Sequence, residues 1–252
     1  MIHILLSRWR QGHRTMAYPK TLPALPDRFR GRPEFAPGAC AEGCRACAEA
    51  CPTGAIGLAP LNLDLGRCLF CTECMDACPE GVIRLTGDHR LAARNRDDLA
   101  QGPGEPPKLA EALGKELMRV LGRSLKLRVV SAGGCNGCEV DVNVLGTLAW
   151  DLGRFGIQFV ASPRHADGLI ICGPVTANMA LAVRKTYDAV PDPKIVIAVG
   201  ACAISGGPYL NQAEQLGGAA GAGIPVDLFI PGCPPHPLTI LDGLLRLLGK
   251  IK

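Results

Sequence analysis

Eight cysteines lie within residues 40–79, in two runs that each end in Cys-Pro. The second run, CLFCTECMDACP at residues 68–79, has the cysteine spacing of bacterial ferredoxins. In that pattern three closely spaced thiolates converge on one 4Fe–4S cluster, and the cysteine before the proline ligates the other cluster. The spacing therefore predicts two clusters, the first held by Cys40, Cys44, Cys47 and Cys78 and the second by Cys51, Cys68, Cys71 and Cys74.

The first run departs from the usual spacing, because three residues rather than two separate Cys40 from Cys44. We expect a one-residue bulge at Gly43 to absorb the extra residue. Disulfides are a weaker interpretation, since the first residues do not have the pattern of a secretory signal peptide. Zinc is also weaker, because two interleaved runs that end in x3-Cys-Pro are not typical of zinc sites.

The composition favours metal chemistry in a reducing compartment. Thirteen cysteines in such a chain indicate metal binding rather than disulfides. The net charge is 27 − 23 = +4 and aromatic residues make up only 4%, so we expect no nucleic-acid partner. No apolar run reaches the roughly 18 residues that would span a bilayer.

Residues 1–18 predict an amphipathic helix, because Ile2, Leu5, Leu6 and Trp9 recur at helical spacing among basic residues. Such a helix suits a membrane surface or a groove on a partner, and a helix packed on this protein is an equal alternative. Five prolines between residues 19 and 37 then predict an extended arm.

The ferredoxin-like region contains an internal repeat, since a short apolar segment follows each Cys-Pro, at residues 53–56 and 81–85. We expect Ile56 and Ile83 to cover the two clusters, because cluster potential depends on solvent exposure. Charged residues 89–99 predict a helix, residues 100–107 a Gly- and Pro-rich linker, and residues 108–121 an amphipathic helix with leucines every four residues.

From residue 125 strands and helices alternate, which predicts a parallel α/β sheet. We expect strands at 125–130, 155–160, 169–172, 195–199 and 227–230, with helices at 177–190 and 238–248. The predicted fold class is α/β, with a parallel flavodoxin-like sheet domain preceded by a small ferredoxin-like α+β domain. The predicted organisation is an amphipathic helix and arm (1–36), a two-cluster ferredoxin domain (37–99), a linker and helix (100–124) and the sheet domain (125–252).

Four of the remaining cysteines follow predicted strands, namely Cys135, Cys138, Cys202 and Cys233. Ligands in open parallel sheets bind beyond the carboxyl ends of the strands, so these thiolates should face one rim. Neighbouring glycines allow backbone to approach a cluster and donate N–H groups to its sulfurs. We therefore predict a third 4Fe–4S cluster there. Cys172 also ends a strand, but the set is complete without it, and we expect a small buried residue.

The runs SAGGCNGCEVD, ASPRHADGLIICGPVT, YDAVPDPKIVIAVGACAISGG and VDLFIPGCPPHPLTILDGLLRLL carry a family resemblance. Residues 125–252 resemble the small subunit of membrane-bound nickel–iron hydrogenases of the formate hydrogenlyase type, and are similar to the homologous cluster-bearing subunit of respiratory complex I. The N-terminal part, with its TMAYP and FRGRP runs and double cysteine motif, resembles the two-cluster ferredoxin subunit of the same complexes. The chain thus looks like a fusion of those two subunits, joined by a segment, 101–122, that resembles neither.

The resemblance implies that the third cluster is the proximal one, beside the nickel–iron centre of a separate large subunit. The complex I subunit has an adjacent Cys-Cys pair at its first ligand position, whereas this chain has Cys135-x2-Cys138, the hydrogenase arrangement. Glu139 is a candidate proton relay, and a surface or helix N-terminal Glu favoured by the helix dipole is the alternative. His165 and His236 receive no ligand role.

The sequence therefore predicts an electron-transfer subunit of an oxidoreductase complex, with three 4Fe–4S clusters and no nickel of its own. Implied partners are the nickel–iron large subunit, membrane subunits and an upstream redox donor or acceptor. The implied location is peripheral, on the cytoplasmic face of the inner membrane. The alternative is a complex I-like subunit that passes electrons to quinone. A structural or regulatory metal-binding module without redox turnover is a third, less favoured hypothesis.

Overall fold

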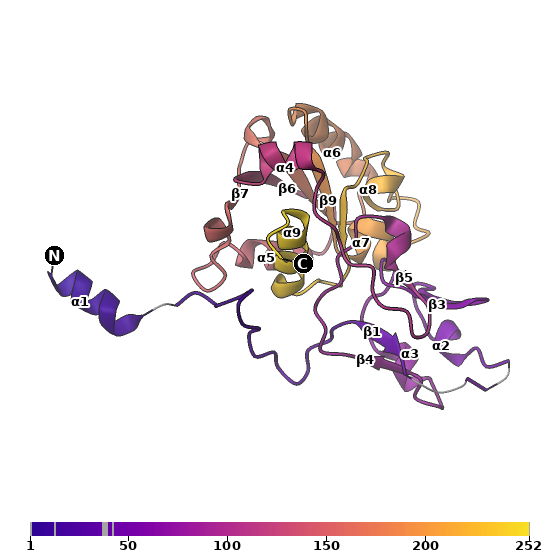
Figure 1. Ribbon diagram of the computed structural model, residues 1–252. Coiled ribbons are helices and arrows are strands. Elements are labelled where there is room, and N and C mark those ends of the chain that lie inside the picture. The colour runs from indigo at the N-terminus through magenta and orange to yellow at the C-terminus, as the bar shows by residue number, and fades with distance from the viewer. Residues whose placement is uncertain (1, 13, 37–39, 42, 252) are drawn as a thin grey trace.

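The C-terminal half of the chain forms a five-stranded parallel sheet in the computed structural model, which describes residues 2–12, 14–36, 40–41 and 43–251 (Figure 1). The strand order is β10-β9-β8-β6-β7, and every neighbouring pair is parallel. Numbered from β6, this is the flavodoxin-like order 2-1-3-4-5. The predicted fold class is therefore confirmed. The strands are β6 (Leu125–Ser131), β7 (Ile157–Phe159), β8 (Gly168–Cys172), β9 (Ile195–Val199) and β10 (Leu228–Ile230).

Both faces of this sheet are covered. Strands β8, β9 and β10 are buried at every residue, as expected for the centre of a doubly wound sheet. One face packs on α5 and α9, and the other packs on α6, α7 and α8. Helix α9 is itself buried along its whole length. The bounds are α5 (Gly137–Val144), α6 (Ala177–Ala189), α7 (Ala201–Ser205), α8 (Gly218–Gly221) and α9 (Pro237–Leu247), with short turns η2 (Leu152–Phe155), η3 (Pro163–His165) and η4 (Gly207–Tyr209).

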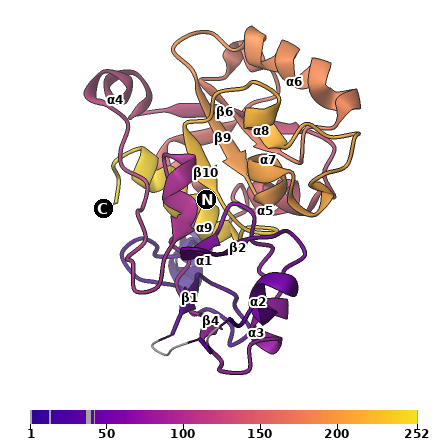
Figure 2. The same cartoon turned by 90° about the vertical axis from the view of Figure 1, so that its right-hand side faces the viewer.

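The ferredoxin-like part lies at one end of the sheet and consists of two small antiparallel sheets with two short helices (Figure 2). Each cysteine run enters a short helix and then a strand, so the predicted internal repeat is present as α2–β2 and α3–β4. The elements are β1 (Pro33–Phe35) paired with β4 (Ile83–Leu85), β2 (Ile56–Leu58), β3 (Leu61–Asp64) and β5 (Ala100–Gln101) in the second sheet, and helices α2 (Ala46–Glu49) and α3 (Glu73–Asp76).

The two parts share one hydrophobic core. Leu65, Leu91 and Leu99 of the ferredoxin-like part are buried in the same cluster as Ala203 and Ile204 of α7. The backbone of Ala93 also pairs with Phe229 of the edge strand β10, through N–H···O bonds of 3.0 and 2.9 Å. The ferredoxin-like part is therefore packed against the sheet rather than held by a tether alone.

Two helices predicted between the parts differ in the structure. The helix expected at 89–99 is wrong, since only η1 (Arg96–Leu99) is helical there and Ala93 pairs with β10 instead. The helix expected at 108–121 is confined to α4 (Lys115–Leu121). Residues before it bond to other segments, Ala110 N–H to Ala92 O at 2.7 Å and Leu113 N–H to Leu247 O at 2.9 Å. Tertiary backbone bonds thus replace helical ones, and residues 100 and 101 belong to the ferredoxin-like sheet as β5.

The N-terminal helix α1 (Ile2–Gln11) forms as predicted and projects away from the rest of the protein (Figure 1). It has no buried residue, and Trp9 is 82% exposed. The alternative that this helix packs on its own chain is therefore wrong. The arm that follows returns to the protein at Met16, whose N–H bonds to Ala149 O at 2.8 Å. Among the described residues, no helix has the length and apolar character to cross a membrane.

Candidate iron–sulfur sites

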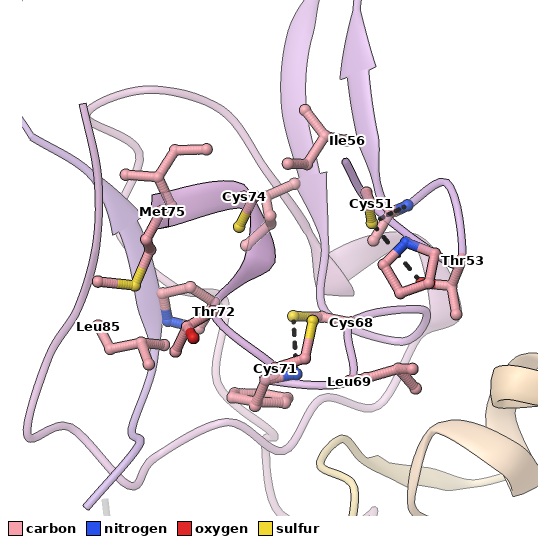
Figure 3. Close-up of a pocket in the computed structure, with 16 residues that line it drawn as sticks. Cys51, Thr53, Ile56, Cys68, Leu69, Cys71, Thr72, Cys74, Met75 and Leu85 are labelled. Atoms are coloured by element: carbon pink, nitrogen blue, oxygen red, sulfur yellow. Dashed lines mark hydrogen bonds between the residues drawn. The ribbon is translucent and has the colours of Figure 1, made fainter. Parts of the chain in front are cut away.

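The second cysteine group surrounds a small apolar cavity in the ferredoxin-like part (Figure 3). Cys51 comes from the end of the first run, whereas the other three cysteines come from the loop and helix of the second run. Ile56, Met75 and Leu85 contribute to the apolar walls. The expectation that Ile56 covers a cluster agrees with this lining, and Ile83 lines the same cavity. The four cysteines on this cavity are Cys51, Cys68, Cys71 and Cys74.

Backbone N–H groups already point at several of these sulfurs. Ala55 N–H donates to Cys51 Sγ at 3.2 Å, and Val82 N–H donates to Cys78 Sγ at 3.4 Å. These two bonds are equivalent in the repeat, because each reaches back four residues to the cysteine of a Cys-Pro pair. Phe70 N–H also donates to Cys68 Sγ at 3.4 Å. N–H donors to cysteine sulfur and an apolar shell are what a 4Fe–4S cluster requires of its surroundings, so the residues fit this group.

The first cysteine group lies beside the second. Cys40 is exposed, whereas Cys47 in α2 is buried. Burial raises the pKa of Cys47, and the negative charges of Cys40 and Cys78 raise it further. Gly43 adopts a positive φ of 73° inside a turn closed by Cys44 N–H and Ala41 O at 3.0 Å. Gly43 is the residue at which we expect the extra residue of the first run to be accommodated.

The third cysteine group gathers at the carboxyl ends of three strands. Cys135 and Cys138 follow β6, Cys202 lies in α7 after β9, and Cys233 follows β10. Cys202 is buried, whereas Cys135 and Cys233 are exposed, so the group faces the surface of the chain. The loops converge on the rim that the sequence predicts for this sheet.

Two glycines leave room for the thiols of this group. A Cβ at Gly200 would lie 2.4 Å from Cys138 Sγ, and one at Gly207 would lie 2.8 Å from Cys202 Sγ. Both residues also have positive φ, of 89° and 56°. Any other residue would therefore displace a sulfur as well as strain the backbone, which explains the glycines around these cysteines.

Burial and neighbouring thiolates raise the pKa of several cysteines. Burial raises the pKa of Cys202 to about 12, and the negative charges of Cys233 and Cys135 add to it. Burial also raises the pKa of Cys74 to about 11, with contributions from Cys51 and Cys71 and a smaller one from Cys47 of the first group. Partial desolvation of the Cys233 thiol raises its pKa, and Cys135 and Cys71 raise it further. Leu69 and Phe70 of the second run line a cavity together with Cys233, and Cys51 belongs to the same run as Cys47, so the second group adjoins both the first and the third.

Cys172 is fully buried at the end of β8, as predicted for a structural residue. Burial raises its pKa well above the ordinary value, and its environment is the hydrophobic core of the sheet. Within the described part of the chain, no three His, Cys, Asp or Glu side chains are grouped closely enough to hold a single metal ion.

The candidate acid and the two histidines have defined places. Glu139 is only 6% exposed, so it is not a surface residue, but it lies in the first turn of α5, as the helix N-terminal alternative expects. Its Oε1 atom is buried without a hydrogen-bond partner among the described residues. His165 ends η3. His236 caps α9, where Nδ1 accepts from Leu238 N–H at 3.1 Å, so its role is structural.

No sequence pattern signalled the polar network that fastens the arm. Tyr18 Oη donates to Asp242 Oδ1 at 2.8 Å, and Arg246 Nε donates to Asp242 Oδ2 at 2.7 Å. His89 Nε2 lies 4.0 Å from the same carboxylate. These four residues are buried although they come from the arm, the ferredoxin-like part and α9. Only the tertiary structure brings Tyr18 and His89 to the Asp242–Arg246 pair of α9, because both are far from that pair in the sequence.

Comparison with known proteins defines the class of these sites. The sequence model of the 4Fe-4S binding domain matches residues 61–84, and that of the NADH ubiquinone oxidoreductase 20 kDa subunit matches residues 135–247. The protein is thus an iron–sulfur subunit of an oxidoreductase complex, and it joins a 4Fe–4S binding domain to a 20 kDa subunit domain in one chain.

Relatives of known sequence agree with this class. The probable membrane-bound hydrogenase subunit mbhJ of Pyrococcus furiosus is 43% identical over 54% of this chain and 81% of its own length. An NADH-quinone oxidoreductase subunit of Clostridium beijerinckii is 46% identical over 45% of this chain and 68% of its own length. The chain belongs to the NADH ubiquinone oxidoreductase 20 kDa subunit family. A chain in the structure of an archaeal membrane-bound sulfane sulfur reductase is 34% identical over 54% of this chain and 75% of that chain, with a TM-score of 0.46.

Proposed function

We propose that this chain is the electron-transfer subunit of a membrane-associated nickel–iron hydrogenase complex of the formate hydrogenlyase type. It would relay electrons between a redox partner at the ferredoxin-like part and the nickel–iron site of a separate large subunit. The observation that carries this proposal is the position of the second cysteine group, because Leu69 and Phe70, which lie between Cys68 and Cys71, line one cavity with Cys233 of the third group.

The three groups would hold three 4Fe–4S clusters, each of which takes up and returns one electron when bound. The ligands would be Cys40, Cys44, Cys47 and Cys78 for the first, Cys51, Cys68, Cys71 and Cys74 for the second, and Cys135, Cys138, Cys202 and Cys233 for the third. The N–H donors at Ala55, Phe70 and Val82 would stabilise the negative charge on sulfur. The apolar walls around the second group would keep water from its cluster.

Nickel would belong to the partner, because every Cys-x2-Cys pair of this chain is already assigned to a cluster. Cys135 and Cys233 are exposed, which supports the approach of a large subunit to the third group. The Cys135-x2-Cys138 arrangement and the similarity to a hydrogenase subunit favour a hydrogenase partner.

Glu139 would take part in proton movement beside the third group. Its carboxylate is buried, and one oxygen has no partner among the described residues, so it is available to a group that the large subunit brings. A carboxylate in that position can accept a proton and pass it on. Glu139→Gln should lower hydrogen turnover of the complex while its iron content stays unchanged.

A specific observation favours the alternative, a complex I-like subunit that passes electrons to quinone. The similarity to a subunit of an NADH-quinone oxidoreductase is as high as that to the hydrogenase subunit. The two functions differ in the metal of the partner and in the final acceptor, so one experiment on the complex separates them.

The test is co-expression with a large subunit that carries nickel-binding Cys-x2-Cys pairs. We expect the two chains to co-purify and their complex to reduce an artificial dye with hydrogen. We expect the chain alone neither to take up nor to evolve hydrogen. Quinone reduction that is sensitive to complex I inhibitors, in a complex without nickel, would replace the hydrogenase proposal with the alternative.

Helix α1 would attach the complex to the membrane or to its membrane subunits, on the cytoplasmic face. Leu5 and Trp9 are 67% and 82% exposed, and basic residues Arg8 and Arg10 lie in the same helix. Replacing Leu5, Leu6 and Trp9 by Ser should release the complex from membranes with its iron content unchanged. Leu181→Ser, at an exposed leucine of α6, is the matched control. Membrane association that survives the triple change would refute this role.

A further inference from the structure

A half-buried contact joins the cysteine loop of the ferredoxin-like part to the helix that carries Cys202. Ser205 Oγ, at the end of α7, donates a hydrogen bond of 2.9 Å to Gly66 O. Gly66 precedes Cys68 by two residues, and Ser205 follows Cys202 by three. Short stretches of chain therefore connect the two ends of this bond to cysteines of the second and third groups. Figure 1 shows α7 beside β3 and β5 at this junction.

Glycine is required at position 66 by the close approach of the two parts. A Cβ built there would lie 2.8 Å from Ile204 Cγ2 of α7 and 2.8 Å from Arg96 Cζ. Ile204 is 4% exposed and belongs to the core that the two parts share. Close-packed interiors transmit such an overlap as a displacement, so a side chain at position 66 would push the loop and α7 apart.

The loop side of the contact is held rigidly. Asp64 Oδ1 accepts from Gly66 N–H at 2.9 Å and from Arg96 at 2.8 Å, while its Oδ2 accepts from Arg96 at 2.6 Å. Thr53 Oγ1, near Cys51, donates to Arg67 O at 2.8 Å. The backbone on both sides of Gly66 is therefore fixed relative to the second cysteine group.

The helix side is fixed as well. Ser205 Oγ also approaches Ala201 O at 3.1 Å within α7, and the backbone of Gly218 packs against Ala203 so closely that a Cβ would lie 2.4 Å from Ala203 O. Gly200, at the start of α7, lies against Cys138 Sγ. A movement of α7 would therefore carry Cys202 with it rather than be absorbed locally.

We propose that Gly66 and Ser205 are positioning residues that set the separation of the second and third cysteine groups, and with it the rate of electron transfer between them. This inference rests on the proposed function. In the step concerned one electron passes between the groups, the donor cluster is oxidised and the acceptor cluster is reduced, and no atom is transferred. The rate of such a step falls steeply as the separation grows, so a small displacement is enough to slow it.

A second contact between the same groups is less suited to this role. Phe70 and Cys233 line a common cavity, and Arg30 donates to Phe70 O at 2.9 Å. Arg30 and Cys233 are both exposed. Gly66 is instead buried and lies against Ile204, which belongs to the core that the two parts share. We therefore assign the positioning role to the Gly66–Ser205 contact.

The experiment compares Gly66→Ala and Ser205→Ala with unchanged protein, using the full chain reconstituted anaerobically. Neither residue is a proposed ligand, so iron content should stay the same in both variants. The matched control is Thr186→Ala, which removes another helical hydroxyl that bonds back to a carbonyl, Ala182 O at 2.7 Å on α6. The readouts are the magnetic interaction between the reduced second and third clusters, measured by EPR, and the rate of electron transfer between them after rapid reduction.

We expect Gly66→Ala to weaken the magnetic interaction and to slow the transfer several-fold, Ser205→Ala to do so to a smaller extent, and Thr186→Ala to change neither. Unchanged interaction and rate in Ser205→Ala, with Gly66→Ala either equally unchanged or unable to take up iron, would overturn the inference. Failure of the proposed function would give a different result. Iron for only two clusters in the unchanged chain would refute the third cluster itself, whatever the two variants do.

Discussion

The ferredoxin-like and flavodoxin-like parts both gather cysteines, but over very different lengths of chain. In the first part all eight cysteines come from residues 40–78, and short turns such as that between Ala41 and Cys44 bring them together. In the second part the four cysteines are spread over residues 135–233 and meet only because β6, β9 and β10 end at the same rim. The cysteine groups of the ferredoxin-like part therefore depend on local turn geometry, whereas the group of the flavodoxin-like part depends on a complete sheet.

The largest expected effect tests whether the sheet rim binds a cluster at all. Three sets of four cysteines imply about 12 iron atoms per chain in anaerobically reconstituted protein. Cys202→Ser or Cys233→Ser should lower this to about 8 and abolish hydrogen turnover of the complex, because the third cluster loses a ligand. The two ferredoxin-like clusters should remain reducible by EPR. An unchanged chain with about 8 iron atoms would show that only the local sites are filled.

The next effect tests whether the third cysteine group needs the backbone of Gly200 to lie close to the sulfur of Cys138. Gly200→Ala would place a Cβ 2.4 Å from Cys138 Sγ at a φ of 89°, so we expect the third cluster to be lost or labile. Gly217→Ala is the matched control, since Gly217 also has positive φ, 77°, but an added Cβ would have no neighbour within 4 Å. The control should cost only backbone strain, about 1 kcal/mol, and keep its iron. Equal iron loss in both variants would mean that strain alone explains the effect.

A smaller effect tests the buried polar network that fastens the arm to α9. Tyr18→Phe removes the hydrogen bond to the buried carboxylate of Asp242, which should lower the free energy of unfolding by about 1–3 kcal/mol. Tyr209→Phe, at a residue that is 40% exposed, should have no comparable effect in the same denaturant titration. If hydrogen exchange showed a loss of protection in the arm alone, the arm would unfold separately from the rest of the protein.

The same polar network predicts that the free energy of unfolding depends on pH. Burial lowers the pKa of His89, and the carboxylates of Asp242 and Asp88 oppose this effect, while Arg90 and Arg246 reinforce it. Since the folded state favours the neutral imidazole, its contribution to stability is complete above the ordinary pKa of 6.5 and is lost as the pH falls below that value. His89→Gln should therefore make the free energy of unfolding less sensitive to acidification. A steeper decline in the variant would contradict this sign.

The smallest expected effect separates ligands from the remaining cysteine. Cys172→Ala should keep the full iron content, because Cys172 lies in the hydrophobic core of the sheet and the rim already has four cysteines. Iron and the EPR spectrum of each cluster are the measurements. Loss of four iron atoms would show that Cys172 replaces one of the proposed ligands.

Much of the fold follows from short-range patterns. The apolar runs at β8 and β9 are predicted almost to the residue, because central parallel strands are buried on both faces and are therefore continuously hydrophobic. The helix expected at 89–99 fails for the opposite reason. Its residues have helical character, but the backbone of Ala93 finds a stronger arrangement on the open edge of β10, which no local pattern reveals.

The sequence by itself determined the chemistry of the chain, because cysteine spacing and strand-end position depend on neighbours along the chain. The tertiary structure decided what lies between the sites. Gly66 and Ser205 become partners only when the two parts pack together, and Tyr18 and Asp242 only when the arm packs on α9. Hydrogen bonds act over about 3 Å, so they are decided by the folded arrangement and not by distance along the chain.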